Sequence, residues 1–335
     1  MRWGIIAALV LPCGVNNSQH QRKTASLILV VLSSLILPAC GKFTYAQESI
    51  VKAYVDAANK TEDPAKKSEL LKMAMEEAES LKKPELLCGP LFLLGSAELK
   101  NDQEKKARAL FLRAIEVAPN ENLKALFNSK VGNEFYYSNK LKEALVFYKQ
   151  AVTLRENVNP LGSKQAYVLA QSMKDLANCQ RDIGNLVEAE VIYKKAIGIA
   201  EEALKNNPKA KYHTATPLVG LARLKIKQGK PDEATALARE ALGVFEEIDN
   251  QPWCGECMFI LGESKQLEGS KESALALYKK AIEAFDFKQE YVHANIIPLL
   301  ETTVSALKAA DENTEAEKLS ERLLKLRKKY NRLPD

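Results

Sequence analysis

Apolar residues recur at helical spacing along most of this chain, and short polar or Gly-containing breaks separate the apolar stretches. In one clear segment, Leu186, Ala189, Tyr193 and Ala196 lie three or four positions apart, which places them on one face of a helix. No segment alternates apolar and polar residues over enough positions to favour a strand. The pattern therefore predicts an all-α protein.

A repeated signature runs through these predicted helices. An Ala follows each turn between two helices, an aromatic residue usually comes four positions later, and a further small residue comes three positions after that. The marker alanines are Ala107, Ala144, Ala189, Ala234, Ala274 and Ala316. Their spacings of 37, 45, 45, 40 and 42 residues predict a series of helical hairpins of similar size.

Small residues and turn formers occupy fixed places in each hairpin. The small position before the turn holds Gly95, Gly132, Ala177, Ala222, Gly262 and, less typically, Val304. Small side chains let two helices approach closely, and we expect the aromatic residue to fill the gap to the neighbouring hairpin. The turn holds Asp102, Asn139, Gly184, Gly229, Gly269 and Asp311. These residue types tolerate the left-handed conformation that such turns require.

This set of positions resembles the tetratricopeptide repeat, in the longer form found in the kinesin light chain. The resemblance covers roughly residues 87–330 and implies a right-handed α-solenoid of stacked antiparallel helix pairs. It predicts about six units, at 88–121, 125–158, 170–206, 215–248, 255–287 and 297–330. Residues 47–86 lack the small-residue match and are interpreted as a degenerate hairpin that caps the stack.

Residues 1–46 have the features of an export signal. They contain four basic residues and no acidic residue, and an apolar stretch between residues 24 and 39 follows Arg22 and Lys23. Two processing routes are open. Cleavage before Cys40 would give a lipid-modified protein, because Leu37 to Gly41 resembles a bacterial lipobox, whereas cleavage after Ala46 would give a soluble one. The prediction is an exported protein that is periplasmic, secreted or lipid-anchored at the cell envelope, with an uncleaved leader as the alternative.

The leader also accounts for the net charge. The chain has 48 Lys and Arg against 43 Asp and Glu, and the part after residue 46 has 44 against 43. A nearly neutral chain gives no argument for nucleic acid. We expect membrane contact only through a lipid anchor or an uncleaved leader, and the oligomeric state is not predicted.

One segment has a catalytic appearance. Trp253 to Cys257 reads Trp-Cys-Gly-Glu-Cys and resembles the thioredoxin motif, but Glu256 replaces the proline and the βαβ context is missing. The favoured interpretation is that Trp253, Cys254 and Cys257 are ordinary helix-start and groove residues, and a local disulfide between the two cysteines is the alternative for an exported chain. No metal-ligand spacing, cofactor motif or other catalytic motif is found, so the sequence predicts a protein that is not an enzyme and needs no cofactor.

The resemblance implies that the first helix of each pair lines a concave groove. The implied groove residues are Asn133, Tyr136, Tyr137, Lys174, Asn178, Arg181, Arg223 and Lys227. This set is basic and rich in amides, so it suits an extended peptide with carboxylates. Plain solvated groove residues are the alternative interpretation. The predicted function is a protein-interaction scaffold or adaptor, with a thiol-disulfide redox protein and a self-assembling structural protein as alternatives.

Overall fold

The structure is a computed structural model that describes residues 42–157, 162–206, 211–285 and 296–329. Cys40 and the rest of the predicted leader up to residue 41 lie outside the described residues. The chain divides into two compact units between Pro119 and Asn120. Within the described residues the secondary structure is helical throughout, and no strand is present.

The first unit contains two helical hairpins. Its elements are α3 (Lys42–Lys60), α4 (Pro64–Ser80), the short 3-10 helix η1 (Pro84–Leu87), α5 (Cys88–Lys100) and α6 (Glu104–Glu116). Asp63 caps α4, because its side chain accepts hydrogen bonds from the backbone N–H groups of Ala65 and Lys66. Helix α3 begins before residue 47, so it runs through the stretch where the sequence predicts a processing site after Ala46.

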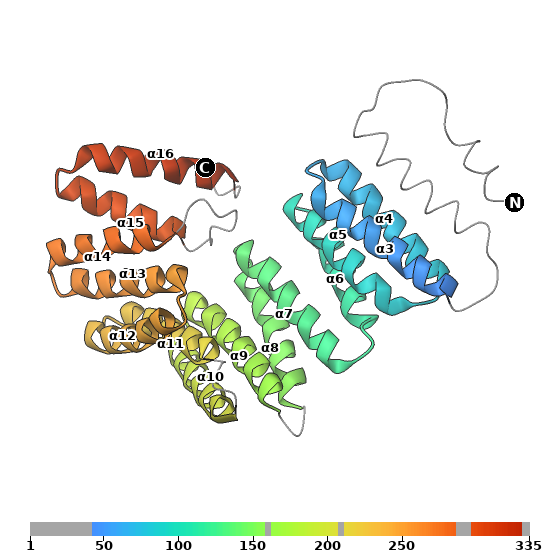
Figure 1. Cartoon of the computed structure of the whole chain (residues 1–335), viewed down its shortest axis with the longest axis horizontal. Coiled ribbons are helices and arrows are strands. Elements are labelled where there is room, and N and C mark those ends of the chain that lie inside the picture. The colour runs from blue at the N-terminus through green and yellow to red at the C-terminus, as the bar shows by residue number, and fades with distance from the viewer. Residues whose placement is uncertain (1–41, 158–161, 207–210, 286–295, 330–335) are drawn as a thin grey trace, which may run out of the picture. The chain divides into compact units, whose positions relative to one another are not determined.

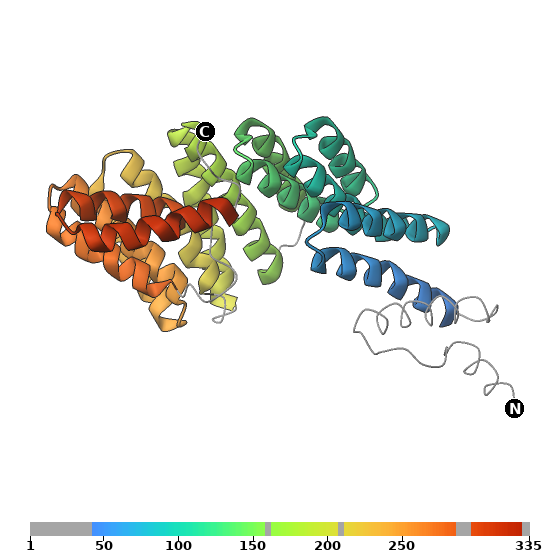
Figure 2. The same cartoon turned by 90° about the horizontal axis from the view of Figure 1, so that it is seen from above.

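The second unit contains five hairpins that stack in chain order. Its helices are α7 (Glu121–Tyr137), α8 (Leu141–Glu156), α9 (Ser163–Ile183), α10 (Leu186–Asn206), α11 (Tyr212–Lys227), α12 (Pro231–Glu247), α13 (Gln251–Leu267), α14 (Lys271–Ala284), α15 (Ile296–Ala309) and α16 (Asn313–Lys329). Figure 1 shows this succession from green α7 to red α16, and Figure 2 shows it from above. The fold is a solenoid of antiparallel helix pairs.

The six predicted turns all adopt the left-handed conformation. Their φ angles are 57° at Asp102, 58° at Asn139, 102° at Gly184, 68° at Gly229, 82° at Gly269 and 59° at Asp311. In each turn the backbone N–H of the next residue donates to a carbonyl five residues earlier, at 2.8 to 3.0 Å. This bond satisfies a carbonyl that the helix end would leave without a partner. The turn chemistry predicted from sequence is confirmed.

The aromatic residue of the repeat packs on the small position of its own hairpin. A Cβ atom added to Gly95 would lie 2.6 Å from the ring of Phe111, and one added to Gly132 would lie 2.7 Å from the ring of Tyr148. Sequence reasoning expected this ring to fill the gap between hairpins. In the structure the ring instead packs inside its own hairpin, in the space that a Cβ atom would occupy. Close packing of the two helices requires that this space is filled.

Tyr193 also spans two hairpins. Its own small position is Ala177, and the tip of its ring reaches Gly220 of the next hairpin, where an added Cβ would lie 2.4 Å away. Its side chain is fully buried among Ala177, Leu221 and Leu224. The expected contact between hairpins therefore exists at this repeat.

None of the helices in the described part of the chain is both long enough and apolar enough to cross a membrane.

Candidate functional site

A hollow of about 270 Å³ lies along the first helices of four successive hairpins in the second unit. Its lining comes from α7, α9, α11 and α13, apart from Tyr148 of α8. We call it the groove. Seven residues implied by the repeat resemblance lie in its wall: Asn133, Tyr136, Tyr137, Lys174, Asn178, Arg181 and Arg223. The eighth, Lys227, lies one helical turn beyond Arg223.

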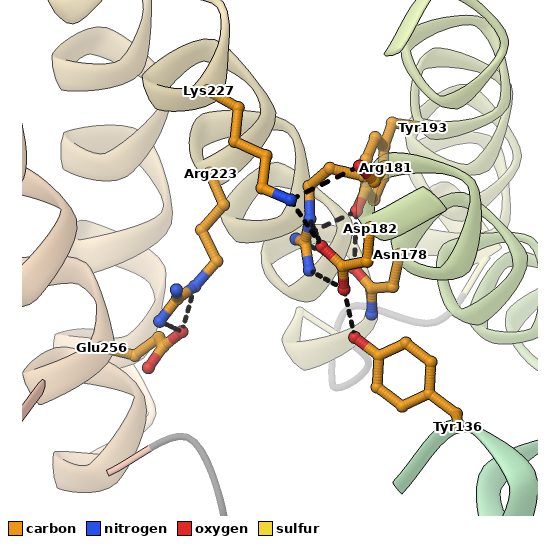
Figure 3. A network of polar contacts seen from close by, with 8 residues as sticks. All are labelled: Tyr136, Asn178, Arg181, Asp182, Tyr193, Arg223, Lys227 and Glu256. Atoms are coloured by element: carbon orange, nitrogen blue, oxygen red, sulfur yellow. Dashed lines mark hydrogen bonds and ion pairs between the residues drawn. The ribbon is translucent and has the colours of Figure 1, made fainter. Parts of the chain in front are cut away.

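A carboxylate joins three of these helices. Asp182 of α9 accepts a hydrogen bond from the Tyr136 hydroxyl of α7 at 2.5 Å and one from the Lys227 ammonium of α11 at 3.1 Å (Figure 3). The Arg181 guanidinium donates to both Asp182 oxygens, at 2.9 Å each. A doubly bonded guanidinium fixes the plane of the carboxylate and positions it between its neighbours.

These bonds set the proton affinity of the carboxylate. Burial alone would raise the pKa of Asp182, but the hydrogen bonds and charge of Arg181, with the bonds from Tyr136 and Lys227, lower that pKa to about 2. Burial also raises the pKa of Tyr136, as does the Asp182 charge. At neutral pH the group is therefore an ionised carboxylate that faces a protonated phenol.

The other groove bases are paired as well. Lys174 lies 3.1 Å from Asp175, and the Arg223 Nε donates to Glu256 at 2.5 Å. The four bases led to the prediction of a basic surface. The structure corrects that interpretation, because each of the four bases contacts an acid of α9 or α13.

Several groove residues escaped the sequence analysis. They are Tyr148, Asp175, Tyr212, Thr216 and Glu256. Trp253, which the sequence analysis interpreted as a helix-start or groove residue, also lines the hollow. The repeat register could have found two of them, because Thr216 and Glu256 both lie six residues before the small position of their hairpins. Lys174 lies three residues before the small position of its hairpin. A residue six positions before the small position is one helical turn farther along, so it lies on the same face of the helix.

The cysteine segment has a packing role. Cys254 and Cys257 are buried free thiols, so the local disulfide considered from sequence is not formed in this structure. Burial raises the pKa of both thiols, whereas a thioredoxin-like thiol needs a lowered pKa. Trp253 stacks on Phe245 with ring centroids 5.3 Å apart, and Glu256 pairs with Arg223. Within the described residues, no group of His, Cys, Asp and Glu could hold a metal ion.

A second hollow of about 780 Å³ lies between α14 and α15, and the sequence analysis predicted nothing there. Small side chains of α15, including Ala306, Ala309 and Ala310, form much of one wall. Lys279 of α14 pairs with Glu312 at one edge, at 2.6 Å. The last hairpin is therefore less closely packed on its neighbour than a filled interface would be.

Comparison with known proteins agrees with the fold. The tetratricopeptide repeat family matches residues 90–121 and 213–286. No curated protein sequence matches the chain significantly. These two stretches of the chain are tetratricopeptide repeats.

Solved structures share the fold at low sequence identity. BtubC (BKLC) from P. vanneervenii is 16% identical, with a TM-score of 0.52 over 72% of this chain and 94% of that one. Aspartyl phosphate phosphatase F from Bacillus subtilis is 14% identical, with a TM-score of 0.52 over 95% and 96%. NprR in complex with its cognate peptide NprX is 13% identical, with a TM-score of 0.53 over 85% and 80%. The fold is typical of protein-interaction scaffolds, although one of these structures is named as a phosphatase.

Proposed function

We propose that this chain is a non-catalytic scaffold that holds an extended peptide segment of a partner protein in the groove of α7, α9, α11 and α13. The observation that carries the proposal is the convergence of four helices on one hollow that is lined by hydrogen-bonding and aromatic side chains. Such a combination suits a peptide, because its backbone offers donors and acceptors at regular intervals. NprR, which shares the fold, is described in complex with a peptide.

The internal ion pairs favour recognition by hydrogen bonds over recognition by charge. Because Asp175, Asp182 and Glu256 already pair with the groove bases, an acidic segment would have to share or displace these acids. That the partner is acidic remains a prediction, which peptide-binding experiments test. The aromatic side chains Tyr136, Tyr212 and Trp253 offer contact area that needs no charge on the partner.

A peptide selection tests the proposal. A displayed library of random 12-residue peptides is selected on the full chain, and the strongest binder is synthesised with a fluorescent label as the probe. Asn178→Ala and Arg223→Ala should weaken probe binding at least tenfold. Lys195→Ala is the matched surface control, because Lys195 lies on α10 and pairs with Glu156 away from the groove. No selected peptide, or equal affinity in all variants, would contradict the proposal.

The two alternative functions predict different results. A thiol-disulfide enzyme would lose its activity in an insulin reduction assay when Cys254 and Cys257 are both replaced by Ser. A self-assembling protein would show a mass above that of one chain in light scattering. We expect no insulin reduction by the unmodified chain, because both thiols are buried and protonated.

The proposed location is outside the cytoplasm, and the argument is the predicted leader of residues 1–46. Intact mass and N-terminal analysis of the protein from its native host test this proposal. A chain that starts at a lipid-modified Cys40 would place the groove at a membrane surface, and one that starts near Gln47 would make it a diffusing binder. An uncleaved chain would contradict export by this leader.

A further inference from the structure

The aromatic position of the repeat carries a polar atom that packing does not use. Tyr193 lies on α10, the second helix of its hairpin, and its buried ring fills space near Ala177 and Gly220. Its hydroxyl passes through the hairpin to the groove side, where it donates to the Asn178 Oδ1 at 2.5 Å. A phenylalanine would fill the same space without this bond, as Phe111 does in the first unit.

We propose that the Tyr193 and Tyr148 hydroxyls are positioning groups that hold two groove asparagines with their amide N–H groups toward a bound peptide backbone. The inference rests on the proposed peptide-binding function for its ligand. The orientation of the asparagines is a property of the free protein and does not depend on the proposed peptide-binding function.

The donors around Asn178 fix its orientation. An arginine can only donate hydrogen bonds, and Arg181 Nη1 contacts the Tyr193 hydroxyl oxygen at 3.3 Å and the Asn178 Oδ1 at 3.4 Å. The Tyr193 oxygen therefore accepts from Arg181, and its proton goes to Asn178. Two donors face one end of the amide, so that end is the oxygen. The amide nitrogen points away from both donors and forms no hydrogen bond to a described residue (Figure 3).

The same tyrosine–asparagine hydrogen bond occurs one repeat earlier. Tyr148 of α8 donates to the Asn133 Oδ1 at 2.7 Å, and both pairs have the same 15-residue separation. Asn133 and Asn178 each lie one residue after the small position of their hairpin, and both line the groove. Burial raises the pKa of both tyrosines, so each hydroxyl keeps the proton that it donates.

The arrangement ends where the sequence changes. In the next hairpin Ala238 replaces the aromatic residue, and Arg223 replaces the asparagine. In the hairpin after that, Tyr278 donates to Gln266 at 2.6 Å, and Gln266 lines the second hollow instead of the groove. The groove thus presents amide N–H donors from two adjacent repeats. Such donors fit the carbonyl oxygens of an extended chain, whatever its side chains are.

Tyr193→Phe tests the inference because it removes the hydroxyl and keeps the ring. With the selected peptide as the probe, we expect a threefold to tenfold loss of affinity, in keeping with the loss of one hydrogen bond. Tyr278→Phe is the matched control, because Tyr278 is equally buried and bonds outside the groove. It should leave probe affinity unchanged.

A double-mutant cycle separates positioning from a general structural effect. If Tyr193 acts through Asn178, then Tyr193→Phe should cost no affinity in an Asn178→Ala background. An equal loss in both backgrounds would overturn the inference, and so would wild-type affinity of Tyr193→Phe.

A measurement without any ligand keeps the inference independent of the proposed function. The side-chain amide signals of Asn178 in a ¹H–¹⁵N spectrum are assigned by their disappearance in Asn178→Ala. They should shift in Tyr193→Phe and stay in place in Tyr278→Phe. Unchanged Asn178 signals in Tyr193→Phe would overturn the inference even if a peptide binds, and a shift without peptide binding would contradict only the proposed function.

Discussion

At the scale of single residues, Asp182 shows how the groove is stabilised. One carboxylate receives bonds from Arg181, Tyr136 and Lys227, which lie on three different first helices. The partners of Asp182 thus connect hairpins that are far apart in sequence. Removing the Asp182 carboxylate would leave the positive charges of Arg181 and Lys227 less neutralised in a partly buried site, which is unfavourable.

The depressed pKa of Asp182 predicts a pH dependence. Its folded pKa of about 2 lies below the unfolded value of about 3.9, so its stabilisation is fully present above pH 4 and is lost as the pH falls toward 2. The difference corresponds to about 2 to 3 kcal/mol of unfolding free energy. Urea unfolding of the wild type and Asp182→Asn between pH 2 and 5 measures it.

The comparison between the two proteins controls for the other acids. The wild type should lose more stability than the variant across this window, because Asp182→Asn cannot titrate. Parallel curves for the two proteins would show that Asp182 is not held as the structure describes.

At this scale the sequence predicted about half of the residues that line the groove but not what they pair with. The repeat register places Lys174, Asn178 and Arg223 on the same face of successive helices, which needs only the helical period. Lys174 and Arg181 pair with the next residue in sequence, but the other two pairings join different hairpins: Glu256 lies 33 positions after Arg223, and Lys227 lies 45 positions after Asp182. Such distances depend on how hairpins pack, and no local pattern encodes them.

At the scale of elements, the hairpin is defined by its turn more than by its helix propensities. Six of the eight left-handed positions in the described residues were predictable, because only a few residue types tolerate a positive φ and they recur at the same place in the repeat. The other two, Lys82 and Asp249, were not predicted. The start of α13 was expected as well, because Trp253 and the two cysteines were interpreted as helix-start and groove residues, and Asn250 caps this helix. Asn250 accepts from the Trp253 N–H at 3.4 Å, which marks this segment as a helix start.

Two glycines with open space around them test the role of the turn. A Cβ added to Gly229 or Gly243 meets nothing within 4 Å, but Gly229 has a φ of 68° in a turn whereas Gly243 lies inside α12. Gly229→Ala should destabilise the protein by about 1 kcal/mol, and Gly243→Ala should stabilise it by up to about 1 kcal/mol. Chemical denaturation checks both, and changes of the same sign would contradict the assigned turn.

At the scale of the whole molecule, each hairpin contacts only its neighbours, so stability need not be uniform. The last hairpin, α15 and α16, has a neighbour on one side only among the described residues, and the hollow of about 780 Å³ lies at that contact. By contrast, α9 and α11 are covered on both sides and carry most of the groove.

Hydrogen exchange followed by mass spectrometry tests this gradient. Backbone amides of α15 and α16 should exchange faster than those of α9 to α11 under native conditions, because local opening needs less energy where fewer apolar contacts break. Uniform protection from α7 to α16 would show that the unit opens only as a whole and would contradict the expected fraying.

The internal pairing of the groove charges also has a kinetic consequence. Because Lys174, Arg181, Arg223 and Lys227 each contact an acid, the groove projects little net field into solution. A partner would then arrive by unassisted diffusion, with an association rate near 10⁵ to 10⁶ M⁻¹s⁻¹ that changes little with ionic strength. Differences in affinity between partners would then come from differences in the dissociation rates of their complexes.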